Sequence, residues 1–233
     1  MTAAPHAERS LLSRLLDVIF PPRCVSCGAF GPFVCGNCAA QLANADHPRC
    51  EVCWQMSEAT RCGECAHRPP AFTAVRAAYV FGGPARDLVH ALKYDGISAV
   101  APEMAAAMSK LLLEWSPEVD VIVPVPMAGV RQRQRGYNQA LLLAREIGRG
   151  TGISVAAKAL SRRPGVSQIE QIDEEARRRN ALKAFAPSRG AVTGTVLLVD
   201  DVMTTGATLD ACARVLKSVG AERVYGLTFA RES

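Results

Sequence analysis

The stretch Val196-Leu-Leu-Val-Asp-Asp-Val-Met-Thr-Thr-Gly-Ala-Thr208 combines a buried strand with a turn of small residues. Its first four residues are all apolar, which is typical of a strand covered on both faces of a parallel sheet. The adjacent carboxylates Asp200 and Asp201 follow, and small residues then lead into a helix. Amides at a helix N-terminus bind phosphate, and carboxylates accept hydrogen bonds from hydroxyl groups. The stretch therefore predicts a site for a phosphorylated ribose at the end of a strand.

The turn itself supplies the candidate ligands of the phosphate. Gly206 lets the backbone approach a ligand closely, and threonine hydroxyls can donate to phosphate oxygens. Simple capping of the helix is the alternative role for the two acids, but a cap needs neither a second carboxylate nor Thr-Thr-Gly-x-Thr. We expect Asp200 and Asp201 to hold the ribose hydroxyls as the catalytic carboxylates. The residues expected to hold the 5′-phosphate are Thr204, Thr205, Gly206, Ala207 and Thr208.

Strand-like and helix-like segments alternate over the C-terminal two thirds of the chain. The strands are expected at 77–81, 119–123, 153–155, 195–199 and 223–228. The helices are expected at 85–94, 100–115, 138–149 and 206–219, with a further polar helix inside 173–181. Strands that alternate with helices of this length imply an α/β fold with a parallel sheet covered on both faces.

Eight of the nine cysteines form four Cys-x-x-Cys pairs in the N-terminal part of the chain. Each pair supplies two thiolates from one tight turn, and two such turns complete a tetrahedral structural zinc site. We therefore predict two zinc ions, with sequential pairing favoured by the short intervals and crossed pairing left open. The predicted ligands are Cys24, Cys27, Cys35, Cys38, Cys50, Cys53, Cys62 and Cys65.

A redox, iron–sulfur or disulfide role is the alternative for these thiols, but four such pairs in one short segment favour zinc. His47 and His67 are close enough in sequence to replace a cysteine ligand. Since eight thiols already match two tetrahedral sites, we expect both histidines to be polar residues facing solvent. The ninth cysteine, Cys212, falls on the apolar face of a predicted helix and is expected to be a small core residue.

Changes in composition divide the chain into three parts. Residues 1–22 contain an amphipathic helix that ends at a pair of prolines, and residues 23–70 are rich in cysteine, glycine and proline. The junction Arg68-Pro69-Pro70 is stiff and marks a boundary. We expect a double zinc ribbon at 23–70 and the α/β domain at 71–233.

Composition also bounds the setting of the protein. No stretch has the roughly 18 to 20 continuous apolar residues of a membrane span, so we expect no span and a cytoplasmic location. Eight thiolates and two zinc ions change the formal charge of +5 to about +1, so overall basicity is a poor argument for nucleic-acid binding. Residues 131–190 nevertheless hold thirteen Arg and Lys against five Asp and Glu, which predicts a polyanionic ligand or partner there. The segment 131–139 is expected to be a basic loop that covers a pyrophosphate.

Several of these segments together resemble the ComF family of amidophosphoribosyltransferase-like competence proteins. The resemblance rests on the cysteine pairs, the ribose-phosphate loop and four further motifs. These motifs are Leu92-Lys93-Tyr94, Pro124-Val-Pro126, Arg135-Gly-Tyr-Asn-Gln139 and Arg177-x-x-Asn180. It implies the type I phosphoribosyltransferase fold, phosphoribosyl pyrophosphate or another phosphoribosyl compound as ligand, and magnesium. We expect Arg133 and Arg135 of the basic segment, together with Lys93, to contact the leaving pyrophosphate, and the resemblance adds Asn138, Arg177 and Asn180 as ligand contacts. The family pattern also has a glutamine before the last motif, and here Gln168 and Gln171 both compete for that place.

Three functions fit the sequence: a phosphoribosyltransferase, a competence factor, and a regulatory or scaffolding protein of the sheet type, which would show neither activity. A phosphoribosyltransferase would release pyrophosphate once the right acceptor is supplied. A competence factor that keeps the pocket as a ligand sensor would instead handle single-stranded DNA, together with other competence proteins. The cysteine segment fits the second role as a recognition surface, but it has few basic residues and no row of aromatic residues for stacking.

Overall fold

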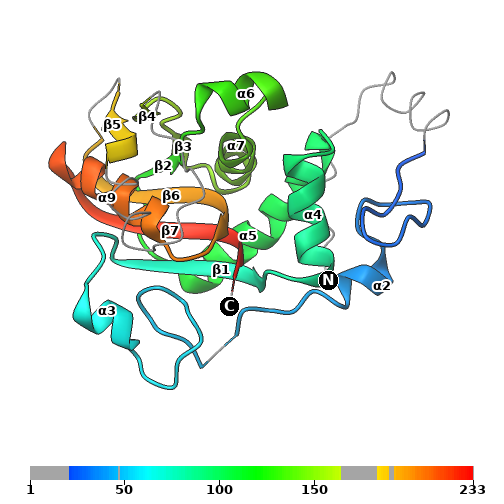
Figure 1. The fold of residues 1–233 in the computed structure, drawn as a ribbon, viewed down its shortest axis with the longest axis horizontal. Helices are drawn as coiled ribbons and strands as arrows, with labels where there is room; N and C mark the ends of the chain where they lie inside the picture. The colour runs from blue at the N-terminus through cyan, green and yellow to red at the C-terminus, as the bar shows by residue number, and fades with distance from the viewer. Residues whose placement is uncertain (1–20, 47, 164–182, 189–191, 233) are drawn as a thin grey trace.

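The computed structural model describes residues 21–46, 48–163, 183–188 and 192–232. Its centre is a parallel sheet of five strands in the order β1-β7-β6-β2-β3 (Figure 1). These strands are β1 (Ala74–Val80), β2 (Val121–Pro124), β3 (Ser154–Val155), β6 (Gly194–Met203) and β7 (Ala221–Arg231). The predicted α/β fold with a parallel sheet is confirmed.

Helices cover both faces of this sheet. On one face lie α4 (Gly83–Lys93), α5 (Ala101–Trp115) and α7 (Gln139–Thr151), and on the other lies α9 (Ala207–Ser218) (Figure 1). Successive residues of β6 point to opposite faces. Leu197 and Val199 accordingly pack in the core with α5 and α7, while Val196 and Leu198 pack in the core with α9. The continuous apolar run of this strand follows from this burial on both sides.

The central strand is longer than the sequence predicts. Pairing with β7 continues past Val199, with Asp200 opposite Thr228 and Met203 opposite Arg231. The two carboxylates are therefore part of the strand, near its end, and do not follow it. Strand β1 likewise begins at Ala74 because it pairs with β7 from that residue onward. The helix predicted at 100–115 is preceded by a short 3₁₀ turn, η1 (Ser98–Val100).

The segment predicted to be a basic loop is instead a short helix, α6 (Gly129–Arg135). Its arginines and glutamines are good helix formers, and Gly136 ends the helix in the left-handed conformation that favours glycine. The sequence analysis also missed a small antiparallel pair, β4 (Leu160–Arg162) and β5 (Phe185–Pro187). The helices predicted within 1–22 and 173–181 lie outside the described residues.

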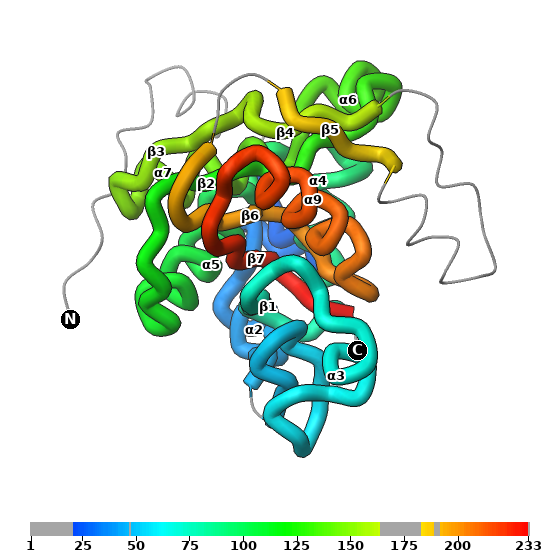
Figure 2. The backbone as a smooth tube through the Cα atoms, turned by 90° about the vertical axis from the view of Figure 1, so that its left-hand side faces the viewer, coloured from blue at the N-terminus to red at the C-terminus, as the bar shows by residue number. Residues whose placement is uncertain are grey.

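The cysteine-rich segment forms two similar units, the first beside α4 (Figure 1) and the second at the edge of the sheet where β1 lies (Figures 1 and 2). Each unit contains one short helix, α2 (Gly36–Ala39) in the first and α3 (Gly63–His67) in the second. An isolated bridge closes each unit, Arg23 with Phe30 and Arg49 with Met56. The second unit is attached to the sheet, since Val75 N donates to Val52 O at 2.8 Å.

Candidate functional site

The eight predicted ligands form two separate groups of four thiols. One group is Cys24, Cys27, Cys35 and Cys38, and the other is Cys50, Cys53, Cys62 and Cys65. Within each group all four sulfur atoms lie within 4.8 Å of one another. Sulfur atoms of different turns approach to 3.6 Å in the first group and 3.7 Å in the second. A tetrahedron of Zn–S bonds has sulfur–sulfur edges of about 3.8 Å, so both groups fit zinc, and the pairing is sequential.

The first cysteine of each group is prepared to be a thiolate. The amide of Cys35 donates to Sγ of Cys24 at 3.5 Å, and the amide of Cys62 donates to Sγ of Cys50 at 3.3 Å. Burial opposes ionisation of Cys24 and Cys50, but backbone N–H groups outweigh it and lower both pKa values to about 6. Such outer hydrogen bonds are typical of structural zinc sites. His67 is exposed and belongs to neither group, as expected, whereas His47 lies outside the described residues.

The ribose-phosphate loop lies at the carboxyl end of β6, where open parallel sheets bind ligands. Gly206 precedes the first residue of α9 and has φ +79°. This backbone conformation favours glycine, and a Cβ atom there would also displace the end of the Met203 side chain, which would lie 2.5 Å away. Thr204 and Thr205 are exposed, and the Thr205 hydroxyl accepts a hydrogen bond from the amide of Ala207. The helix N-terminus lies at this turn, where the sequence predicts a phosphate, and phosphate binding there stays a prediction.

The two carboxylates beside this loop have different partners. Asp201 is buried and forms an ion pair with Lys93, with 2.8 Å between Nζ and Oδ1. Asp200 is half-buried, and its Oδ1 accepts from the amide of Asp201 at 2.9 Å. Burial and the neighbouring Asp201 carboxylate raise the pKa of Asp200 to about 7, against the opposing effect of Lys93. Lys93 and Arg162 both favour the charged form of Asp200, but they do not offset the effects of burial and of Asp201.

A basic pocket of about 430 Å³ lies next to Lys93. Its lining includes Arg131, Gln134 and Arg135 from α6, and Tyr94 from the end of α4. The Arg135 guanidinium lies 5.3 Å from the Tyr94 ring centroid, in cation–π geometry. The three α6 residues are three and four positions apart, so one helix face carries them all. The pocket therefore offers several cations to an anion beside the ribose site.

The structure does not bring every predicted ligand residue together. Arg133 is exposed on α6 and does not line the basic pocket, because the helical period points it away from Arg131 and Arg135. Asn138 caps α7: its Oδ1 accepts from the amide of Ala140, and its Nδ2 donates to Val125 O. Substrate contacts by both residues stay predictions. Arg177, Asn180, Gln168 and Gln171 lie outside the described residues.

Two arginines near the site were not among the predicted ligands. Arg131 lines the basic pocket, and its spacing from Gln134 and Arg135 would have identified it once the segment was known to be a helix. Arg162, in β4, is partly buried, and its Nε has no hydrogen-bond partner among the described residues. Burial and Arg131 lower the Arg162 pKa, whereas Cys212 and Asp200 act in the opposite direction. No local pattern around Arg162 indicates this, since β4 is a short strand far from β6 in the chain. Cys212 is buried in the core, as expected.

Comparison with known proteins agrees with this arrangement. Residues 92–232 match the phosphoribosyl transferase domain family, and residues 15–66 match the double zinc ribbon domain. The DNA utilization protein YhgH of Salmonella typhi is 30% identical over 172 residues, which cover 70% of this chain and 74% of that protein. The chain belongs to the ComF family. Competence protein F of Haemophilus influenzae, which is 28% identical to this ComF-family protein, aligns over 83% of this chain and 89% of its own.

Among solved structures, the glutamine phosphoribosylpyrophosphate amidotransferase of B. subtilis overlays this ComF-family protein with a TM-score of 0.39 at 21% identity. The overlay covers 55% of this chain and 26% of that chain. Within the described part of the chain, no helix is both long enough and apolar enough to cross a bilayer.

Proposed function

We propose that this ComF-family protein is a phosphoribosyltransferase that binds phosphoribosyl pyrophosphate at the Asp200–Thr208 loop. The observation that supports this most is the ion pair between Lys93 and Asp201, because it joins the ribose carboxylates to the cations of the basic pocket. A ligand with a 5′-phosphate, ribose hydroxyls and a pyrophosphate needs these three environments side by side. The matched family and the loop geometry support the same ligand.

Residues of different charge would bind different parts of the ligand. Displacement of pyrophosphate passes through a cation-like sugar and an anionic leaving group, so catalysis requires placed charges and exclusion of water. The 5′-phosphate would lie against the amides and hydroxyls of Thr204 to Thr208. Asp200 and Asp201 would hold the ribose hydroxyls. The leaving pyrophosphate would be neutralised by Lys93, Arg131 and Arg135, with Arg133 as a further proposed contact.

Magnesium is part of this proposal. Its hard oxygen ligands would come from the ligand itself and from the Asp200 and Asp201 carboxylates, whose shared negative charge has Lys93 as its ion-pair partner. When bound, the ion would neutralise charge on the pyrophosphate. Arg177 and Asn180 are proposed to contact the same ligand.

Calorimetric titration with phosphoribosyl pyrophosphate and magnesium tests the proposal. We expect binding that requires magnesium and that weakens at least tenfold in Asp201→Asn, because this variant keeps the shape of the side chain and removes its charge. Glu222→Gln is the matched control, since it removes an exposed carboxylate on β7, away from the loop, and should bind like the wild type. Binding that is equal in wild type and Asp201→Asn, or no binding at all, would contradict this assignment.

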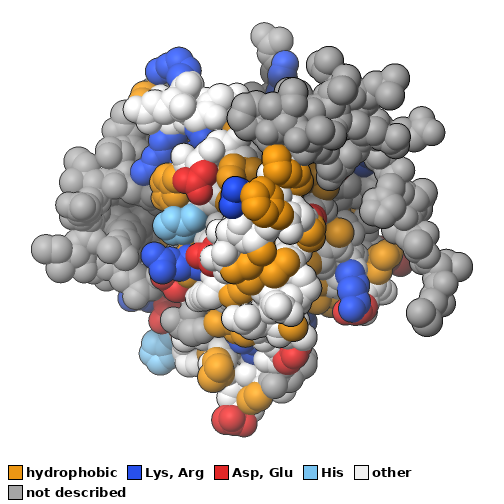
Figure 3. All heavy atoms as spheres, turned by 90° about the vertical axis from the view of Figure 1, so that its right-hand side faces the viewer, with side chains coloured by type: hydrophobic (Ala, Val, Ile, Leu, Met, Phe, Trp, Pro, Cys, Tyr) orange, Lys and Arg blue, Asp and Glu red, His pale blue; other side chains and the backbone are white. Residues whose placement is uncertain are grey.

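Single-stranded DNA binding is the second candidate function, and the names of the relatives favour it, since they include DNA utilization and competence proteins. The basic pocket on α6 is the described feature that suits a phosphate backbone. The face shown in Figure 3 does not support DNA binding. Hydrophobic side chains gather in its middle, and charges of both signs are scattered over it. No continuous basic stripe is visible among the described residues of that face.

Fluorescence anisotropy with a labelled oligothymidine separates the two functions. A DNA-handling protein would lose affinity steeply with salt, and Arg131→Gln with Arg135→Gln would reduce the slope of log K against log salt. Equal slopes in the wild type and the double variant would count against a role for α6 in DNA binding.

A further inference from the structure

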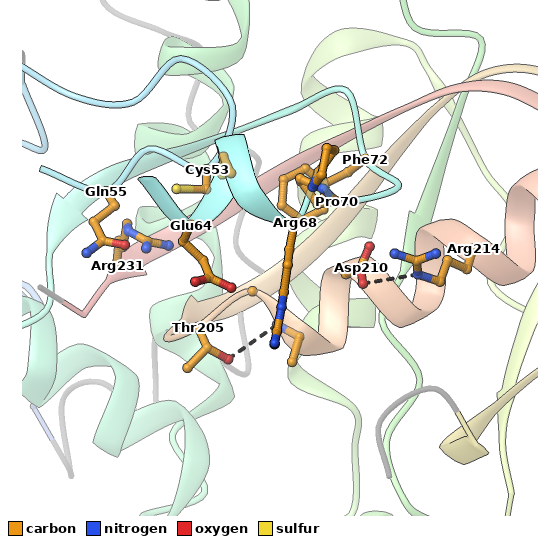
Figure 4. Close-up of a pocket in the computed structure, with 14 residues that line it drawn as sticks. Cys53, Gln55, Glu64, Arg68, Pro70, Phe72, Thr205, Asp210, Arg214 and Arg231 are labelled. Atoms are coloured by element: carbon orange, nitrogen blue, oxygen red, sulfur yellow. Dashed lines mark hydrogen bonds and ion pairs between the residues drawn. The ribbon is translucent and has the colours of Figure 1, made fainter. Parts of the chain in front are cut away.

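A second pocket, of about 460 Å³, lies between the second zinc unit and the start of α9 (Figure 4). Zinc ligands Cys53 and Cys65 line one side of it, and Thr205 and Gly206 of the ribose-phosphate loop line another. The stiff junction between the domains contributes apolar surface through Pro69, Pro70 and Phe72. This volume is in the usual range for small-molecule sites, and apolar walls with a few polar groups are typical of them.

Arg231 is the unusual residue of this pocket. It is the last residue of β7, only 4% of its surface is exposed, and Nε and Nη1 of its guanidinium have no hydrogen-bond partner among the described residues. Burial lowers its pKa, while Cys53, Cys62 and Cys65 act in the opposite direction. Two buried guanidinium nitrogens without acceptors are costly, so these two nitrogens need hydrogen-bond acceptors from another source.

The position of Arg231 connects the pocket to the ribose site. It pairs with Met203 across the sheet, and the amide of Glu232 donates to Met203 O at 2.9 Å. Met203 is the last residue of β6 before the ribose-phosphate loop. The residue that follows the stiff junction is attached to α9, because Ala71 N donates to Asp210 Oδ1 at 2.6 Å. The pocket therefore lies at the carboxyl ends of the strands, as the loop does: Arg231 ends β7, and Met203 ends the neighbouring strand β6.

The charges around the pocket select the kind of ligand. Three arginines line it, Arg68, Arg214 and Arg231, and two carboxylates, Glu64 and Asp210. A zinc ion held by four thiolates adds a net charge of about −2 at the wall that Cys53 and Cys65 form. The negative charges of the two carboxylates and the zinc–thiolate group thus exceed the positive charge of the three arginines. The total charge of the pocket therefore does not attract an anionic ligand. A neutral ligand that presents acceptor atoms satisfies the guanidinium without adding charge.

We infer that this pocket binds an uncharged, planar ring that carries carbonyl acceptors, next to the loop that begins α9. The apolar surface of Phe72 and the prolines would contact such a ring, and a carbonyl oxygen of the ring would accept from Arg231. The second zinc unit then has a direct part in substrate binding, because its ligands form the wall of the pocket. The binding of this ring does not depend on the proposed transferase function.

Calorimetry on zinc-loaded wild-type protein tests the inference with two matched pairs of rings, with and without ribose 5-phosphate. Hypoxanthine carries an oxygen where adenine carries an amino group, and we expect it to bind at least ten times more tightly. Orotate is uracil with an added carboxylate, and we expect it to bind no more tightly than uracil. Adenine or orotate binding more tightly than its partner would overturn the inference, as would the absence of binding by all four rings.

Two variants distinguish this pocket from the ribose site. Arg231→Lys keeps a positive charge next to the zinc thiolates but removes the fork of donors, so we expect at least tenfold weaker hypoxanthine binding with two zinc ions still bound. Asp201→Asn should weaken phosphoribosyl pyrophosphate binding at least tenfold and keep hypoxanthine binding. Arg231→Lys that loses zinc and still binds hypoxanthine normally would assign Arg231 a purely structural role and overturn the inference.

If Arg231→Lys does not fold, the wild-type protein still gives a decision. Amide chemical shifts that change on addition of hypoxanthine should fall on Gln55, Thr205 and Gly206, which line the pocket. Changes confined to other parts of the protein would place the ring elsewhere and contradict the inference.

Discussion

At the scale of single residues, the pair Asp200 and Asp201 places two carboxylates side by side at the expense of stability. Asp201 has Lys93 as its ion-pair partner, whereas Asp200 is half-buried beside a like charge that raises its pKa to about 7. In the unfolded chain the same carboxyl ionises near pH 4. At neutral pH the folded protein therefore holds a carboxylate in a place that disfavours its charge.

The variant Asp200→Asn should accordingly be more stable than the wild type at high pH. Because the folded state binds the proton more tightly than the unfolded state, the contribution of Asp200 is most favourable below pH 4 and is lost as pH rises through 7. We expect equal stability at pH 4 and a gain of roughly 2 kcal/mol for the variant at pH 8, less than the full shift implies because Asp200 is partly exposed. Urea unfolding at both pH values, with magnesium and ligand absent, measures this. A variant that is less stable than the wild type at pH 8 would show that Asp200 is stabilised by its surroundings.

Single residues also show where sequence analysis succeeds and where it stops. The acids and the small-residue turn could be predicted because strand, acids and helix start are contiguous in the chain. The ion-pair partner of Asp201 could not be predicted in this way, because Lys93 comes from the end of α4. The sequence indicated Lys93 only as a contact of the leaving pyrophosphate. Arg131 and Arg162 were missed for the same reason, because their place depends on how separate elements pack.

At the scale of secondary-structure elements, the Asn138 side chain links the segment after β2 to the start of α7. Its side chain accepts from Ala140 N at 3.1 Å and donates to Val125 O at 3.0 Å, so it caps the helix and fixes the segment that follows the strand. We expect Asn138→Ala to lower the free energy of unfolding by about 1 to 2 kcal/mol. Asn138→Asp keeps the acceptor and loses the donor, so its melting temperature should lie between those of the wild type and Asn138→Ala. An Asp variant no more stable than the Ala variant would show that the bond to Val125, not the cap, is decisive.

The elements were predicted best where hydrophobic periodicity is strong. The core helices and β6 were found because their apolar patterns have the helical or strand period, and their ends shifted where pairing or capping extends an element. The segment 129–135 lacks apolar residues apart from Val130, so no hydrophobic period marks it as a helix. The antiparallel pair of β4 and β5 has three residues in each strand, which is too short to produce a pattern.

At the scale of the whole molecule, the two zinc units differ in how they join the α/β domain. Cys50, Cys53 and Cys65 belong to the same hydrophobic core as Val196 and Leu198 of β6. Further contacts come from β1: Arg76 donates to Glu51 O at 2.8 Å, and its guanidinium lies 4.0 Å from the Trp54 ring centroid. The first unit instead packs near α4, where Ser26 Oγ donates to Asp87 at 2.6 Å. The sequence shows two equal units, and this inequality arises only from their packing.

Matched cysteine variants should reveal this difference. Cys35 and Cys62 are equivalent, since each precedes the short helix of its unit and each is partly exposed. Both serine variants should lose one zinc ion, but Cys62→Ser should also loosen the core beneath β6 and the loop that β6 carries. If these contacts contribute roughly 2 kcal/mol, the melting temperature of the α/β domain should fall about 4 to 8 °C further in Cys62→Ser than in Cys35→Ser. Phosphoribosyl pyrophosphate binding should weaken only in Cys62→Ser, and equal losses in both variants would show that the units support the domain alike.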